Sequence, residues 1–200
     1  IKALRECKDV RLRGCDILSA EFGWSSRGIE MTGCSAESEY FMLRASALTL
    51  RDVRMTGKYS FQYIEDAVFD GCTFDTKDAF WHAKNVTVRN SLVKGEYLAW
   101  YSENLTLENC RIIGTQPLCY CKNLRLIDCE LLDADLCFER SEVNAGITTP
   151  VVSIKNPLAG RICVPAVGEI IRDIPGANGE ICIKGELAKE TEENACQKTY

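Results

Sequence analysis

The chain has 200 residues, of which 46% are hydrophobic, and its 29 acidic side chains outnumber 24 basic ones. This length suits one domain or one continuous solenoid. The mild acidic excess gives no electrostatic reason to expect a nucleic-acid partner or an anionic membrane surface. Neither a signal peptide nor an apolar run near the roughly 18 residues that cross a bilayer is visible, so we expect no membrane partner.

Short phrases recur along the chain at intervals of 19 residues. NVTVRNS, NLTLENC and NLRLIDC begin at residues 85, 104 and 123. With Val10 taken as position 1 of the repeat, positions 1 and 3 are apolar in ten successive copies, and we expect this register to hold as far as Ile181 and Ile183. A fixed period of this length predicts a repeat architecture.

Each copy contains three segments with strand periodicity. Positions 1 and 3 are apolar between polar neighbours, and so are positions 6 and 8. Positions 11 to 18 form a longer third segment, for which we expect positions 13, 15 and 17 to face inward. Gly, Asn and Asp recur at positions 5 and 19, and Ser, Thr or Gly at position 10, which predicts three corners. Leucine-rich repeats lack three such corners.

These features predict an all-β fold, a single-stranded parallel β-helix of about nine to ten coils with three short strands per coil. Leu4, Cys7 and Asp9 fit positions 14, 17 and 19 of the repeat. We therefore expect the chain to start in mid-coil, with further coils or a cap upstream. More Pro and Gly in residues 143–186 predict looser coils with longer corner loops. We expect one domain over residues 1–186 and a polar tail or cap over residues 187–200.

The chain has twelve cysteines, and several of them form a column at position 6 of the repeat. Val53 and Ser91 occupy the same column, which indicates that this position requires a small side chain rather than sulfur chemistry. The pair Cys119 and Cys121 has no His or acidic partner at ligand spacing, so we expect neither a metal nor another cofactor. This many unpaired thiols favours a reducing compartment, and we expect a cytoplasmic protein.

If positions 13, 15 and 17 face inward, positions 12, 14 and 16 place a stripe of rings and polar groups on one face. Rings with polar edges suit sugars, so we expect a poly- or oligosaccharide ligand. The stripe could instead be a subunit interface of a homo-oligomer, or the parity could be inverted so that Trp81 and Trp100 are exposed. The predicted ligand-binding residues are Tyr63, Phe80, His82, Tyr101, Tyr120 and Arg44.

Two carboxylates near this stripe are candidates for glycoside hydrolysis. Such a pair requires carboxyl groups roughly 5–9.5 Å apart, and we expect Asp78 and Glu96, which fall in adjacent coils, to be candidates for this spacing. Together with Asp75 they also resemble an oxygen-ligand cluster for Ca²⁺, although acids stack by chance on any β-helix surface. His82 has no nucleophile in reach and forms no triad. The sequence leaves open whether the protein is an enzyme.

The stretch DAFWHAKNVTVRNSLVKGEYLAWYSENLTLENCRIIG resembles the central coils of a bacterial family called domain of unknown function 3737. Its marks are Phe80–Trp81 and the phrase from Gly95 to Leu105, and the likeness extends from about Cys7 to residue 167. This family is grouped with the pectin-lyase-like right-handed parallel β-helices, so the resemblance implies that fold and hand. It transfers no catalytic residue.

The wider group contains polysaccharide lyases and hydrolases, which favours carbohydrate by analogy of fold. The resemblance is therefore compatible with three functions. The first is carbohydrate binding along the stripe, the second is a polysaccharide lyase or glycoside hydrolase, and the third is a structural or assembly module.

Overall fold

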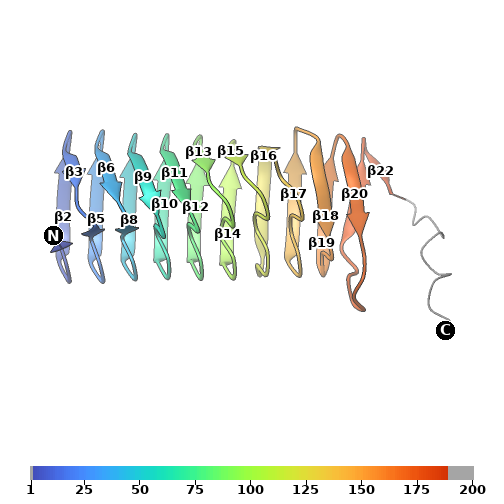
Figure 1. The fold of residues 1–200 in the computed structure, drawn as a ribbon, viewed down its shortest axis with the longest axis horizontal. Helices are drawn as coiled ribbons and strands as arrows, with labels where there is room; N and C mark the ends of the chain where they lie inside the picture. The colour runs from blue at the N-terminus through green and yellow to red at the C-terminus, as the bar shows by residue number, and fades with distance from the viewer. Residues whose placement is uncertain (1, 189–200) are drawn as a thin grey trace.

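The computed structural model describes residues 2–188. They form a β-solenoid of about ten turns, in which coils of about 19 residues stack along one axis (Figure 1). Within this part of the chain there are no helices, so no helix of the length and apolarity needed to cross a membrane is present.

The first side of each coil is a strand of a continuous parallel sheet. It runs from position 18 of one copy of the repeat to position 4 of the next. Val86, for example, pairs with Ala67 in the preceding coil and with Leu105 in the following one, which confirms the 19-residue register. The strands of this side are β2 (Lys8–Arg13), β5 (Arg27–Thr32), β8 (Ser46–Arg51), β10 (Glu65–Asp70), β12 (Lys84–Arg89), β14 (Glu103–Glu108), β16 (Leu124–Leu132), β17 (Glu142–Ile147), β19 (Ala159–Val164) and β21 (Glu180–Ile183).

The second side is also a parallel ladder, and β16 continues onto it around the corner. Its other strands are β3 (Asp16–Leu18), β6 (Ser35–Ser38), β9 (Arg54–Lys58), β11 (Thr73–Lys77), β13 (Leu92–Lys94) and β15 (Arg111–Ile113). The third side has only two-residue strands in the first coils and longer ones near the C-terminal end. These are β1 (Lys2–Ala3), β4 (Glu21–Phe22), β7 (Tyr40–Phe41), β18 (Val151–Lys155) and β20 (Val167–Ile171).

The predicted register changes near the C-terminal end. Val143 pairs with Gly160 and Ala145 with Ile162, so this coil has 17 residues between paired positions instead of 19. The expectation that the register runs unchanged through ten copies is therefore wrong. The apolar pattern hides the change, because a shift of two residues leaves the same side chains facing inward.

The core fills the interior of the coils with the predicted apolar columns. Side chains at positions 1, 3 and 8 are buried from the second to the seventh coil, as Leu48, Leu50 and Phe74 illustrate. The cysteine column also faces inward, and Cys110 and Cys129 are 2% and 0% exposed. Each donates its S–H to backbone carbonyls, and all cysteines among residues 2–188 are free. The interpretation of position 6 as a small inward filler is confirmed.

A ladder of amide hydrogen bonds lies along the corner at position 19. Asn123 donates to Asn104 (2.8 Å), Asn104 to Asn85 (2.9 Å), and Asn85 to Asp66 (3.0 Å). All four residues have left-handed backbone, with φ between 49° and 57°. Each side-chain amide therefore donates a hydrogen bond to the side chain one coil before it. The corner backbone adopts the left-handed conformation that Asn and Asp tolerate better than most residues.

The last strand of the first side ends in a hairpin. β22 (Glu186–Leu187) runs antiparallel to β21, with Cys182 opposite Leu187. An antiparallel strand at this edge occupies backbone groups that another parallel coil would use. The predicted tail over residues 187–200 lies, beyond residue 188, outside the described residues.

Candidate functional site

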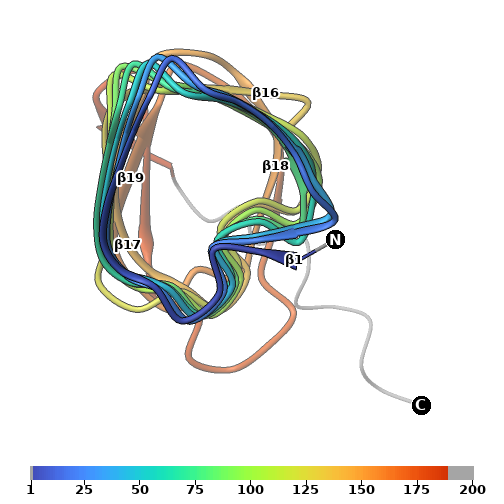
Figure 2. The ribbon, with the colours of Figure 1, turned by 90° about the vertical axis from the view of Figure 1, so that its left-hand side faces the viewer.

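The third side of the middle coils has an unusual backbone. Tyr59, Phe61 and Tyr63, at positions 12, 14 and 16, have φ values of 49°, 60° and 57°. The same three positions are left-handed in the next three coils. This segment is therefore not the long strand that the sequence predicts, and Figure 2 shows that the chain bends inward on this side, beside β1.

Hydrogen bonds between coils hold this backbone in place. The Phe61 N–H donates to the Phe41 carbonyl of the preceding coil (2.7 Å), whereas the Tyr63 N–H donates to the Trp81 carbonyl of the following coil (2.8 Å). Positions 14 and 16 thus bond in opposite directions along the axis. Simple inward and outward alternation of side chains, which a regular strand would produce, does not apply here.

Position 14 lies in the core, so the prediction that it faces solvent is wrong. Phe80 is 1% exposed, and its ring is stacked on that of Phe61 with the centroids 5.0 Å apart. Met42, Ala99 and Leu118, at the same position in other coils, are fully buried. Phe80 is therefore a core residue and cannot contact a ligand at the surface.

Position 16 does carry a surface stripe, which we call the ring column: Tyr63, His82, Tyr101 and Tyr120. Successive ring centroids are 4.7, 5.0 and 4.8 Å apart, and the planes differ by 8°, 9° and 12°. Tyr63 and Tyr101 are 45% and 46% exposed, and the Arg44 guanidinium lies over the Tyr63 ring at 5.7 Å. Five of the six predicted ligand-binding residues are thus brought together.

The stacking decides what the ring column offers to solvent. The His82 ring is covered on both faces, by Tyr63 and by Tyr101, and Tyr101 is likewise covered by His82 and Tyr120. Ring faces between neighbours are not available for a sugar to stack on. The exposed surface consists of ring edges, with phenol hydroxyls and an imidazole as hydrogen-bonding groups.

The tryptophans at position 15 are neither core nor free surface. Trp81 and Trp100 are half-buried and stacked, with centroids 5.4 Å apart. Their indole N–H groups donate to the Tyr97 and Gln116 carbonyls of the following coil, at 2.7 and 2.8 Å. Trp24 makes the same bond to Tyr40. These side chains therefore join adjacent coils, a role that the sequence pattern did not reveal.

We expect Trp81→Phe to lower the free energy of unfolding by about 1 to 2 kcal/mol, because the Tyr97 carbonyl loses its donor while the ring is largely kept. Urea denaturation followed by circular dichroism measures this change. Tyr63→Phe, which removes only an exposed hydroxyl, is the control and should stay within about 0.5 kcal/mol of the parent. Equal losses in the two variants would contradict the assigned role of the indole N–H.

The two candidate acids lie in adjacent coils beside the ring column. The Asp78 N–H donates to the Glu96 carbonyl (3.0 Å), and Asp78 is 6% exposed. Burial raises the pKa of the Asp78 carboxyl, Lys77 opposes this effect and Glu96 adds to it. The Glu96 carboxylate is paired with the Lys77 ammonium at 3.1 Å. Within residues 2–188, no three acidic, His or Cys side chains form a group that could hold a metal ion.

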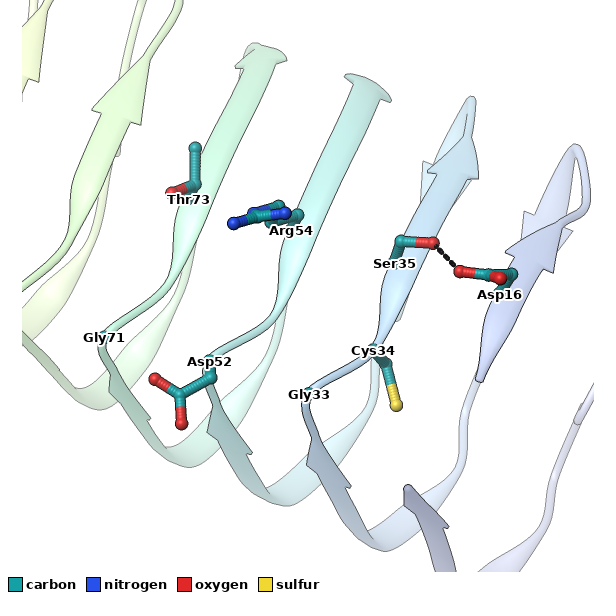
Figure 3. Close-up of a pocket in the computed structure, with 8 residues that line it drawn as sticks. All are labelled: Asp16, Gly33, Cys34, Ser35, Asp52, Arg54, Gly71 and Thr73. Carbon is teal, nitrogen blue, oxygen red and sulfur yellow. Dashed lines mark hydrogen bonds between the residues drawn. The ribbon is translucent and has the colours of Figure 1, made fainter. Parts of the chain in front are cut away.

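A groove of about 410 Å³ runs along the corner between the first and second sides, in the early coils (Figure 3). Glycines at position 5, Gly33 and Gly71, line it on either side of Asp52. In later coils Asn90 and Asn109 occupy this position and are joined by an amide hydrogen bond of 2.8 Å. The groove is thus the space that asparagine fills elsewhere. The glycines in the sequence predict a corner, but the sequence pattern did not predict the groove.

The chain matches a family whose description assigns it no activity. Comparison with curated proteins gives no match. The pectin-lyase-like grouping, the right-handed sense and the bacterial source, which the resemblance implies, stay predictions. The family described as "Protein of unknown function (DUF3737)" matches residues 1–183, and the chain belongs to it.

Proposed function

We propose that this protein binds a poly- or oligosaccharide along the ring column. The observation that carries the proposal is the row of exposed ring edges, with Tyr63 and Tyr101 each nearly half exposed. Coils repeat at the strand spacing of about 4.8 Å, so like groups recur at short regular intervals along the axis. An extended glycan repeats its hydroxyls in the same way, and phenol and imidazole groups both donate and accept hydrogen bonds.

The proposed contact is made through edges rather than faces. A sugar stacked flat on a ring would need an uncovered face, whereas His82 and Tyr101 have a neighbouring ring on each side. Stacking also holds the rings in one orientation, so little side-chain freedom remains to be lost on binding. The glycan would then lie parallel to the solenoid axis, with Arg44 at one end of the column.

The alternatives have less support. For a lyase or hydrolase, Asp78 and Glu96 are the candidate pair, but Lys77 already engages the Glu96 carboxylate. An assembly module would use the same stripe as a subunit interface, and no observation within residues 2–188 favours it over a ligand. The binding experiment that tests the proposal has a different outcome for each alternative.

The test is binding to an array of neutral and uronate-containing oligosaccharides, followed by titration of the strongest hit. We expect the double variant Tyr63→Phe and Tyr101→Phe to bind about tenfold more weakly or worse, because two hydroxyls that donate or accept hydrogen bonds are lost while the ring stack remains. Tyr59→Phe, on the same side of the coil but outside the ring column, is the matched control and should bind as the parent does.

Three results would overturn the proposal. They are an array without signal above background, unchanged binding in the double variant, and equal weakening in Tyr59→Phe. Cleavage of a bound glycan that is abolished by Asp78→Asn would support the enzyme instead. A dimer that dissociates in the double variant, seen by light scattering, would support the assembly module.

A further inference from the structure

Two cysteines lie side by side on the outer face of the last coils. Cys163 in β19 and Cys182 in β21 are directly paired across the parallel ladder. Their neighbours Ile162 and Ile181 are buried in the core, so both cysteines point to the opposite face of the sheet. Cys163 is partly exposed, whereas Cys182 is buried, with 5% of its surface exposed.

The geometry meets the main requirement for a disulfide. Directly paired residues of adjacent parallel strands have Cα atoms about 4.8 Å apart, within the 4.4–6.8 Å that disulfides span. Both side chains leave the same face of the sheet from directly paired positions, so closure requires a change of side-chain rotamers and only a small backbone shift. Most other cysteines in the described coils point into the core, where a dissolved oxidant does not reach.

Cys110 and Cys129 supply the internal comparison. They also belong to adjacent coils, but they face inward and are 2% and 0% exposed. Both pairs join adjacent coils, and the difference between them is the solvent access of Cys163, since Cys182 is itself only 5% exposed. Buried thiols of this kind are inert, whereas a partly exposed thiol reacts.

We propose that Cys163 and Cys182 form a thiol pair that low-molecular-weight disulfides, such as oxidised glutathione, convert to an intramolecular disulfide. The Cys163 thiolate attacks the glutathione disulfide, forms a mixed disulfide and releases one glutathione thiolate. The Cys182 thiol then gives up its proton and attacks the Cys163 sulfur, which releases the second glutathione. Two protein thiols are oxidised and one glutathione disulfide is reduced to two thiols, so the electrons balance.

The cross-link would join the C-terminal hairpin to the coil before it. Cys182 lies on β21, which pairs with β22 in the hairpin that ends the first side. The disulfide would close one whole coil, from residue 163 to residue 182, and thereby restrict the unfolded chain. The oxidised form should therefore resist separation of the terminal hairpin, the part of a solenoid that has a neighbour on one side only.

The experiment incubates the full chain with oxidised glutathione and maps the peptides by mass spectrometry. Burial raises the pKa of the Cys163 thiol, and the neighbouring Cys182 thiol adds to this effect, so the reaction should accelerate from pH 7 to pH 9 as more thiolate forms. We expect a Cys163–Cys182 cross-linked peptide, and a midpoint of thermal unfolding that rises by about 5 °C. Cys110 and Cys129 should remain reduced and should react only after denaturation.

Single variants separate this pair from other thiols. In Cys182→Ser the second step is blocked, so the mixed glutathione disulfide at Cys163 should accumulate, and in Cys163→Ser neither product should form. The double variant Cys110→Ser and Cys129→Ser should form the cross-link as the parent does. The proposal is overturned if Cys163 links to another cysteine such as Cys196, or if the folded chain forms no Cys163–Cys182 cross-link under conditions that oxidise the denatured chain.

Discussion

Gly95→Ala is expected to lower the free energy of unfolding by about 3 kcal/mol or more, from overpacking together with left-handed backbone strain. Gly95 has a φ of 150°, and a Cβ added there would overlap the Thr76 carbonyl oxygen and lie 2.7 Å from its carbon. The obstructing atoms belong to the backbone of the preceding coil, so no side chain can move aside. Relief requires the two coils to separate locally.

Gly33→Ala is the matched control for this effect. Gly33 has a φ of 60°, but a Cβ added there has no atom within 4 Å. This variant should lose only the cost of left-handed backbone, about 1 to 2 kcal/mol. Urea denaturation followed by circular dichroism measures both variants. If Gly33→Ala costs as much as Gly95→Ala, contact between coils is not the reason that glycine is required at position 95.

Phe61→Ala is expected to cost about 3 to 5 kcal/mol, the usual loss for removing a fully buried phenylalanine. Phe61 is 0% exposed, and its ring centroid lies 4.9 Å from that of Phe74, 5.0 Å from those of Phe69 and Phe80, and 5.4 Å from that of Phe41. Deleting the ring leaves a cavity that joins three consecutive coils. The surrounding backbone is tied above and below, so the cavity cannot collapse fully.

Hydrogen exchange locates the part of the chain that Phe61→Ala destabilises. In a solenoid each coil contacts only its neighbours, so amides near the third coil should exchange faster than those near the C-terminal hairpin. Tyr63→Ala, two residues away but at the surface, is the control and should cost less than about 1 kcal/mol. A Phe61→Ala variant as stable as Tyr63→Ala would contradict the assignment of position 14 to the core.

The 19-residue spacing of apolar and corner residues is enough to predict the repeat and the two regular sides of each coil. Position 1 is apolar in copy after copy, as Val86 and Leu105 illustrate, because stacked strands place like residues above one another. The same logic correctly predicts the inward cysteine column, and it also explains the amide ladder from Asn123 to Asp66. A short local pattern suffices here, since each strand repeats the environment of the one beneath it.

The conformation of the third side is set by contacts between coils, which the residue pattern does not predict. Its residues show a strand-like pattern, yet Phe80 points into the core and Trp81 is only half-buried, the opposite of what strand alternation predicts. The reason is that every second residue, at positions 12, 14 and 16, has a left-handed φ. These conformations are unfavourable for non-glycine residues in isolation and persist only because hydrogen bonds to the coils on either side compensate. The exposed ring edges depend on the same contacts. The alternation of residues in the sequence cannot report bonds between coils, so this side required the assembled fold.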